Sequence, residues 1–191
     1  MIEVMLRISM ILGLLSVGAC SRPALAGPQA DAARAVDLAD NYRLGVGDKV
    51  RVIVFNEERL SGEFQVSAAG TLSIPLIGEV PAIQHTTSDV ATNIQKLFAD
   101  GYLKNPKVSI EVLTYRPYFI LGEVQTAGQY PYSNGLTVMN AIASAAGFTP
   151  RADKKTVFIR RSGDATERPY KLTPDLRVYP GDTVRLGERF F

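Results

Sequence analysis

The chain has 191 residues, of which 46% are hydrophobic and 21% are charged, and its formal net charge is +2. These values are ordinary for a folded chain of one or two small domains. The small net charge gives no indication of nucleic-acid binding, which usually needs a clustered basic face. A single Cys and a single His exclude a disulfide within the chain and disfavour a structural zinc site.

The N-terminus has the pattern of a secretory signal peptide. A basic residue precedes an apolar run at Ile8–Ala19, which is far shorter than the roughly 20 residues that span a bilayer. Two processing sites are compatible with this run. The letters VGAC end at Cys20 and are similar to a bacterial lipobox, which predicts a signal peptide over residues 1–19 and lipidation of Cys20. Ala24–Ala26 before Gly27 instead suits ordinary signal peptidase, which would leave a soluble periplasmic protein.

The position of the lone Cys at the end of the apolar run favours lipidation. Ser21 then stands where an Asp would favour retention at the inner membrane, so the expected anchor is the periplasmic face of the outer membrane. Residues 20–41 are rich in Ala, Pro, Gln and Asp and show no strand periodicity. This composition predicts a tether between the anchor and the folded part.

Alternating apolar residues predict the first strands. The letters YRLGVGD contain a tight turn at Gly47 and Asp48, which leads into a strand at Lys49–Phe55. A second alternating run predicts a strand at Leu72–Leu76. Pro75 makes that strand an edge or introduces a kink, because proline cannot donate to a sheet ladder.

A helix with an apolar stripe is predicted next. The segment Thr86–Asp89 offers N-cap residues, and Gly101 suits the C′ position after the helix. The stripe consists of Val90, Ile94, Leu97 and Phe98. After a turn at Asn105–Pro106 the apolar residues alternate again, which predicts a strand at Val108–Leu113.

A seam between two domains is predicted at Tyr115–Pro117. The elements after it follow the order strand, strand, helix, strand, strand, which a β-grasp requires. Turns are expected at Gly128 and at Gly147, which ends the helix. The five elements are expected at Tyr118–Val124, Gln129–Tyr132, Thr137–Ala146, Thr156–Arg161 and Pro169–Leu172.

The predicted fold class is α+β, with domains at residues 42–113 and 114–191. The letters GDKVRV and GDTVRL, which begin at Gly47 and at Gly181, form a weak internal echo. Convergent turn chemistry explains this echo better than duplication, because Gly and Asp strongly favour turns. The side chains expected in the core are Val52, Val54, Ile74, Ile94, Phe98, Ile110, Ile120 and Ile142.

Three patterns that suggest chemistry have plainer explanations. Gly45–Lys49 lacks the GK[ST] ending of a phosphate-binding loop and leads into a strand instead of a helix. His85 is the only imidazole, and a solvated turn residue is its simpler interpretation. Glu57, Glu58 and Glu63 would suggest a glycosidase pair, but adjacent acids on a strand face opposite sides and the chain has no Trp. The sequence therefore predicts no catalytic, cofactor-binding or metal-binding residue.

Two surface features leave binding open. A tyrosine cluster can stack on a sugar or line a protein contact, although packing between strands is the simpler interpretation. An excess of basic residues in 151–171 can attract an acidic glycan or an acidic subunit, or it can form the solvent face of a hairpin. The tyrosines are Tyr115, Tyr118, Tyr130 and Tyr132, and the cations are Arg151, Lys154, Lys155, Arg160, Arg161, Arg168 and Lys171.

Five motifs follow one another in a recognisable order. The pattern Y-x-L-x-x-G-D lies at Tyr42–Asp48, and G-x-(I/L)-x-x-P-L-(I/L)-G lies at Gly70–Gly78. LGEVQTAGQY at Leu121–Tyr130, AAGFT at Ala145–Thr149 and the GD pair at Gly181–Asp182 before a final ERFF complete the set. Together they resemble the outer-membrane polysaccharide export family. The residues expected to form its structural turns are Gly47, Asp48, Gly70, Pro75, Gly78, Gly122, Gly128, Gly147, Gly181 and Asp182.

The resemblance implies a small mixed-sheet export domain followed by one soluble ligand-binding β-grasp (SLBB) domain. It further implies a non-enzymatic subunit of an exopolysaccharide or capsule export conduit. The implied partners are the exported polysaccharide, an inner-membrane co-polymerase or chain-length protein, and further copies in a homo-oligomeric ring. No cofactor and no nucleic acid are implied.

One departure from the family leaves an alternative open. Longer members continue into an amphipathic helix that forms the outer-membrane pore, whereas this sequence stops at Phe191. A separate outer-membrane barrel is therefore a further candidate partner. The alternative of a different class is a monomeric periplasmic β-grasp lipoprotein that holds a glycan or tethers partners without channel activity.

Overall fold

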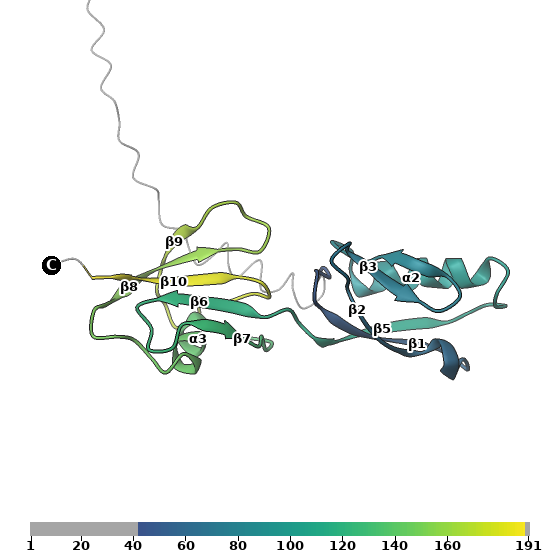
Figure 1. Cartoon of the computed structure of the whole chain (residues 1–191), viewed down its shortest axis with the longest axis horizontal. Helices are drawn as coiled ribbons and strands as arrows, with labels where there is room; N and C mark the ends of the chain where they lie inside the picture. The colour runs from purple at the N-terminus through teal and green to yellow at the C-terminus, as the bar shows by residue number, and fades with distance from the viewer. Residues whose placement is uncertain (1–41, 190–191) are drawn as a thin grey trace, which may run out of the picture.

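The computed structural model describes residues 42–189. Figure 1 shows two domains side by side along the long axis, joined by a short segment between strands β5 and β6. The predictions for the signal peptide, for Cys20 and for the tether concern residues 1–41, which lie outside the described residues, as do residues 190–191.

The first domain is built on a three-stranded antiparallel sheet. Its strands lie in the order β2-β1-β5, with β1 at Lys49–Val54, β2 at Gly62–Gln65 and β5 at Val108–Thr114. Helix α2 covers one face of this sheet, and a two-stranded hairpin packs beside it. These further elements are the 3-10 turn η1 at Glu58–Leu60, β3 at Thr71–Ile74, β4 at Gly78–Pro81 and α2 at Thr87–Ala99.

Side-chain alternation explains how the first domain closes around its core. Every second residue of β1 is buried, and so is one stripe of α2. The helix begins with a capping box, in which Thr86 and Asp89 exchange hydrogen bonds of 3.1 Å between side chain and backbone. The central buried side chains are Val50, Val52, Val54, Leu72, Ile74, Val80, Val90, Ile94 and Phe98.

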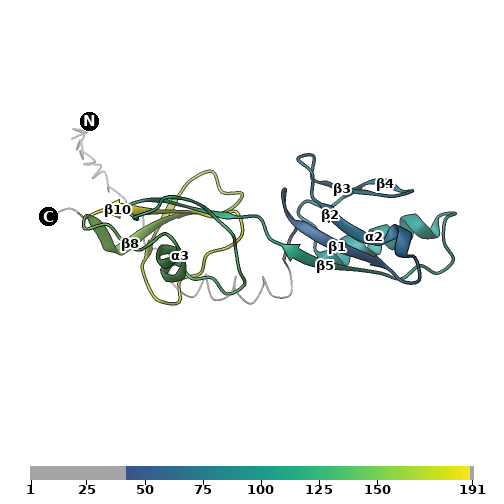
Figure 2. The ribbon, with the colours of Figure 1, turned by 60° about the horizontal axis from the view of Figure 1, so that its bottom comes forward.

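The second domain is a five-stranded mixed sheet with one short helix. The strands lie in the order β7-β6-β10-β8-β9; β10 and β6 are parallel, and the other pairs are antiparallel. Figure 2 shows α3 across one face of the sheet. The bounds are β6 Tyr118–Gly122, β7 Gly128–Tyr130, α3 Val138–Ser144, β8 Ala152–Arg160, β9 Arg168–Lys171 and β10 Thr183–Glu188. This arrangement is a β-grasp, and the described residues have the predicted α+β class.

The predicted core is confirmed. Val52, Val54, Ile74, Ile94, Phe98, Ile120 and Ile142 are all buried. Ile110 is partly buried and packs against the same core. It lies on β5, which is an edge strand of its sheet, and an edge strand has a neighbour on one side only.

Several element limits differ from those predicted. The sequence predicted neither β2 nor β4. β3 ends at Ile74, because Pro75 begins the hairpin loop and Leu76 has a positive φ of 71° and is 61% exposed. Helix α3 ends at Ser144 rather than at Ala146, because Ala146 already has a positive φ of 62°.

Candidate functional site

The described residues contain no evident catalytic or metal-binding cluster. Between residues 42 and 189, no group of three His, Cys, Asp or Glu side chains is placed to hold a metal ion, and no helix has the length and apolar character needed to cross a membrane. His85 is exposed, with its Nδ1 2.9 Å from the carbonyl oxygen of Ile83. Glu63 pairs with Arg51 at 3.0 Å on the sheet surface. The buried charges lie elsewhere, at the turns before β1 and β10.

The carboxylate of Asp48 is fully buried at the turn before β1. It accepts hydrogen bonds from the backbone N–H of Gly45 at 2.8 Å and from the hydroxyl of Tyr42 at 2.6 Å. Beyond the end of β5, Arg116 donates to it twice, through its backbone N–H at 2.7 Å and through its guanidinium at 3.3 Å. The carboxylate thus ties the turn to the exit of the first domain.

The carboxylate of Asp182 is equally buried at the turn before β10. It accepts hydrogen bonds from the backbone N–H groups of Tyr179 at 2.8 Å and Ser162 at 3.1 Å, and from the guanidinium of Arg161 at 2.7 Å. That guanidinium is 2% exposed and lies 5.2 Å and 4.6 Å from the ring centroids of Tyr170 and Tyr179. Burial raises the pKa of Asp182, and the charge of Arg161 opposes this shift.

Arg116 lies between the two turns and contacts both domains. On the side of the first domain, its Nη1 donates to the hydroxyl of Tyr42 at 3.2 Å as well as to Asp48. On the side of the second domain, its Nε donates to the carbonyl oxygen of Pro180 at 3.2 Å, and its Nη2 donates to Oγ of Ser162 at 3.4 Å. One guanidinium therefore joins the turn of Asp48 to the turn that precedes β10.

Two glycines leave room for this guanidinium. A Cβ atom on Gly45 would lie 1.8 Å from Nη1 of Arg116, and a Cβ atom on Gly181 would lie 2.7 Å from its Nε. Gly181 also has a positive φ of 80°, which favours glycine on its own. Gly45 does not have a positive φ, so glycine is required there only because a side chain would collide with the guanidinium. Gly47 is the opposite case, because it has a positive φ of 92° and open space around it.

Three tyrosine rings line the same junction between the domains. Tyr115 makes edge-to-face contacts with Tyr42 at 4.9 Å and with Tyr132 at 5.5 Å between ring centroids. Burial raises the pKa of Tyr42 above its ordinary range, and burial raises the pKa of Tyr132 to about 12. Tyr118 and Tyr130 instead stack on each other across β6 and β7. The predicted tyrosine cluster is therefore divided between the domain junction and the second sheet.

Three of the predicted turn residues lie in or just before the β3–β4 hairpin. Pro75 begins its loop, and Gly78 follows with a positive φ of 73° and no atom within 4 Å of a Cβ built on it. Gly70, just before the hairpin, has a positive φ of 82°, and its Cβ would lie 2.6 Å from Cγ2 of Ile83. Backbone conformation thus accounts for glycine at both positions, and close packing adds to it at Gly70.

The second domain holds the other predicted glycines. Gly122 has a positive φ of 82°, and a Cβ atom there would lie 2.0 Å from the carbonyl oxygen of Leu186 on the neighbouring strand. Gly147 has a positive φ of 91° and donates its N–H to the carbonyl of Ile142, which ends α3. Gly128 opens β7 without a positive φ, so backbone conformation gives no reason for glycine there.

The sequence does not predict the roles of the two arginines at the buried turns. Arg116 is part of the predicted seam, and Arg161 is one cation of the basic segment 151–171. A usable signal was present, because a GD turn directly before a buried strand places its carboxylate in the interior, where a cation must accompany it. No local pattern identifies the cation, because Arg116 is 68 residues from Asp48 and Arg161 is 21 residues from Asp182 along the chain.

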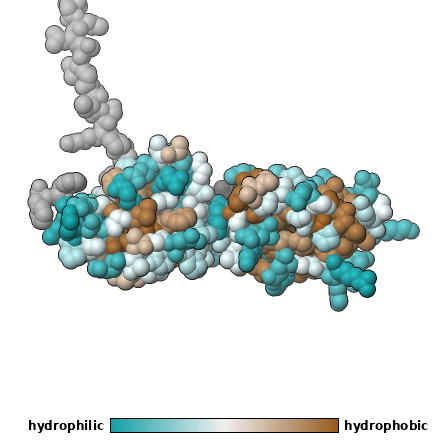
Figure 3. Space-filling view, in the orientation of Figure 1, coloured by the Kyte–Doolittle hydropathy of each residue, from teal (hydrophilic) through white to brown (hydrophobic). Residues whose placement is uncertain are grey.

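Both domains also expose large apolar side chains. Ile53 and Phe55 at the end of β1 are 46% and 65% exposed, and Phe119 and Leu121 on β6 are 40% and 42% exposed. Figure 3 shows brown, hydrophobic areas between polar ones on the visible face of both domains. Exposed apolar groups of this kind are suited to contacts with other molecules.

Comparison with known proteins finds two family models, in the order of the two domains. The model for polysaccharide biosynthesis/export protein matches residues 36–113, and the model for the SLBB domain matches residues 117–169. Together they cover most of the chain.

Curated relatives carry related descriptions. The exopolysaccharide production protein ExoF of Rhizobium meliloti is 40% identical over 162 residues, which cover 78% of this chain and 38% of that protein. The polysialic acid transport protein KpsD of Escherichia coli is 22% identical, over 85% of this chain and 31% of its own. The EPS I polysaccharide export outer membrane protein EpsA of Ralstonia nicotianae is 26% identical, over 70% of this chain and 42% of its own.

The chain spans less than half the length of each of these relatives. The ranges matched by the two family models include Asp48 and Gly122. Both domain models occur once, in the same order as in the fold. The chain belongs to the polysaccharide biosynthesis/export family and joins an export domain to an SLBB domain.

Proposed function

We propose that this chain is a subunit of a conduit that exports an exopolysaccharide or a capsular polysaccharide through the periplasm and outer membrane. The observation that carries the proposal is the succession of both family domains in one chain, held together by Arg116. The relatives are described as an exopolysaccharide production protein, a polysialic acid transport protein and an EPS I polysaccharide export outer membrane protein. The chain itself carries out no catalysis, so the driving force for export comes from its partners.

We further propose that copies of the chain form a homo-oligomeric ring. A heterologous contact closes into a ring only when each subunit holds one fixed geometry. Arg116 supplies such a constraint between the domains, and the exposed Ile53, Phe55, Phe119 and Leu121 supply apolar surface for contacts between copies. An inner-membrane co-polymerase and a separate outer-membrane barrel are the proposed further partners.

The proposed location is the periplasmic face of the outer membrane. In this proposal residues 1–19 are the signal peptide, Cys20 is lipidated, residues 20–41 are a tether, and the domains occupy 42–113 and 114–191. Mass spectrometry of the mature N-terminus tests the anchor. A diacylglyceryl group on Cys20 is the expected result. A free N-terminal Gly27 would show that the mature chain has no lipid anchor and is a soluble periplasmic protein.

A deletion strain tests the export function. Removing the gene should stop the polymer from reaching the medium while the synthesis enzymes remain present. Complementation with the parent chain, with His85→Ala or with Glu58→Gln should restore secretion, because neither residue has an assigned chemical role. Complementation with Phe55→Glu should fail, because the charge disrupts an exposed contact surface without entering the core. Normal secretion in the deletion strain would contradict the proposal.

The alternative is a monomeric β-grasp lipoprotein that binds a glycan or tethers partners. The size of the purified mature chain separates the two functions. Light scattering should give a mass many times that of one chain for a ring and the mass of one chain for the alternative.

A further inference from the structure

The second domain contains a basic pocket at its end far from the first domain. It lies where β8 begins and β10 ends, and its volume is about 560 Å³, within the range of roughly 300–1,000 Å³ typical of small-molecule sites. The pocket is lined by Pro150, Ala152, Asp153, Lys154, Lys155, Glu188 and Arg189.

The charges around this pocket favour an anion. Glu188 forms an ion pair with Arg151 at 2.6 Å, and the carboxylate of Asp153 accepts the backbone N–H of Lys155 at 2.8 Å. Among residues 42–189, no carboxylate lies within ion-pair distance of the ammonium group of Lys154 or Lys155. Both acids of the lining are thus engaged by neighbours.

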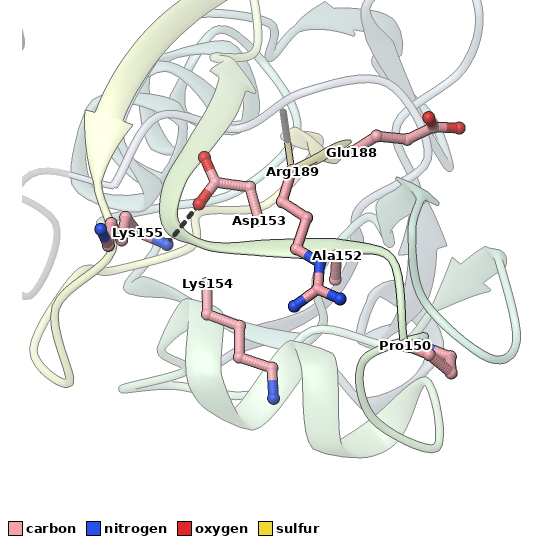
Figure 4. Close-up of a pocket in the computed structure, with 7 residues that line it drawn as sticks. All are labelled: Pro150, Ala152, Asp153, Lys154, Lys155, Glu188 and Arg189. Carbon is pink, nitrogen blue, oxygen red and sulfur yellow. Dashed lines mark hydrogen bonds between the residues drawn. The ribbon is translucent and has the colours of Figure 1, made fainter. Parts of the chain in front are cut away.

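The side chains are also arranged for a mixed polar and apolar ligand. Figure 4 shows the charged ends of Lys154 and Arg189 on the same side of β8, whereas Glu188 points away from them. Nζ of Lys154 lies 5.5 Å from the ring centroid of Phe148, so an aromatic ring adjoins this ammonium group. A sugar that carries a carboxylate presents both an anionic group and an apolar ring face, and it matches this combination.

We propose that this pocket binds a carboxylate-bearing sugar unit of an acidic polysaccharide. Lys154 contacts the carboxylate, and the ring of Phe148 lies next to that lysine. The inference rests on the proposed export function, which identifies the exported polymer as the ligand. It adds that the exported polymer is acidic and that the second domain recognises its charge.

Calorimetric titration of the purified mature chain tests the pocket. The probes are an oligogalacturonate and a neutral malto-oligosaccharide of the same length, each at low ionic strength, because salt screens exposed charges. The parent chain should bind the oligogalacturonate and not the neutral oligomer. Lys154→Glu/Lys155→Glu should weaken binding at least about tenfold, because it replaces attraction by repulsion. The control Lys104→Glu/Lys107→Glu makes the same charge change in exposed residues of the first domain and should retain binding within about twofold of the parent.

Each other outcome overturns the proposal. Equal losses in the two double variants would show attraction to overall charge without a site. Equal binding of both oligomers would show that the pocket does not read the carboxylate, and no binding of either would remove the site. Thermal melting of both variants checks that each remains folded. Normal secretion in the deletion strain together with specific oligogalacturonate binding would end the export function and leave the pocket intact, so the two failures are distinguishable.

Discussion

The turns before β1 and before β10 have the same pattern of backbone hydrogen bonds, but the arginines that pair with their carboxylates are placed differently. In each turn the N–H of the Asp donates at 3.1 Å to the carbonyl of the residue three positions earlier, and the carboxylate accepts the N–H of that residue at 2.8 Å. Each carboxylate also accepts a backbone N–H from a residue just after the neighbouring antiparallel strand. Arg116 donates to Asp48, and Ser162 donates to Asp182. The similarity between GDKVRV and GDTVRL in the sequence therefore extends to the hydrogen bonds of the two turns.

The cations show what distinguishes the two turns. Arg161 is 2% exposed and bonds within the second domain, whereas Arg116 is 21% exposed and bonds both to Asp48 of the first domain and to Pro180 of the second. The same turn chemistry closes one domain at Asp182 and joins two domains at Asp48. Changes at Asp182 should therefore act mainly on stability, and changes at Asp48 should also act on the orientation of the domains.

The largest loss of stability is expected from Asp182→Asn. This change removes the carboxylate that faces the buried guanidinium of Arg161, and such a loss costs about 3–5 kcal/mol in the free energy of unfolding. Urea unfolding of the mature chain, followed by circular dichroism, measures the effect. Asp175→Asn is the matched control, because Asp175 is exposed in the same domain and should change stability by less than about 0.5 kcal/mol. A loss below about 1 kcal/mol at Asp182 would show that the buried pair contributes little.

Asp48→Asn should cost less, about 2–3 kcal/mol, because hydrogen bonds to a charged group contribute about 1.5–3 kcal/mol and Arg116 can turn partly to water. The same urea titration gives the comparison directly. A greater loss at Asp48 than at Asp182 would reverse the proposed order of the two turns.

Gly45→Ala should cost about 1–2 kcal/mol, because the new Cβ displaces the guanidinium of Arg116 from its hydrogen bonds. In an Arg116→Ala background the same change should cost almost nothing. The double-mutant cycle reports this coupling. Gly62→Ala is the control, because its Cβ would make an ordinary 3.5 Å contact, and it should behave the same in both backgrounds. Additive effects of Gly45→Ala and Arg116→Ala would exclude the displacement.

The smallest effect is expected from Tyr42→Phe, which removes the hydroxyl that donates to Asp48 and should cost about 1 kcal/mol at neutral pH. Burial and the neighbouring carboxylate raise the pKa of Tyr42 above its ordinary value of 10.0. The folded state therefore favours the neutral phenol, and the stabilisation that this provides is present below pH 10 and declines as the pH rises above it. Melting temperatures above pH 10 should fall less steeply for Tyr42→Phe than for the parent. Parallel curves would indicate that Tyr42 titrates as an exposed tyrosine does.

Much of the fold was predictable because its elements carry local signals. Val50, Val52 and Val54 alternate in β1, and Thr86 and Asp89 form the capping box that begins α2. These patterns depend on neighbours along the chain, so they can be read without knowledge of tertiary contacts. The limits of β3 were less predictable, because Leu76 continues the apolar alternation while its backbone already turns.

The junction between the domains was not predictable for a related reason. Arg116 is 68 residues from Asp48 along the chain and 64 residues from Pro180, so no local pattern connects them. The sequence around Gly45 resembles only an incomplete phosphate-binding loop. Gly45 is required because a Cβ atom there would lie 1.8 Å from Nη1 of Arg116.

Whether Arg116 fixes the orientation of the domains is tested most directly by a distance between them. Spin labels at Lys96→Cys on α2 and Lys171→Cys on β9 report that distance by double electron–electron resonance in a Cys20→Ser chain, which has no other cysteine. The parent should give one narrow distance distribution, and Arg116→Ala should broaden it while both domains remain folded. Identical distributions in the two chains, whether narrow or broad, would contradict the role of Arg116.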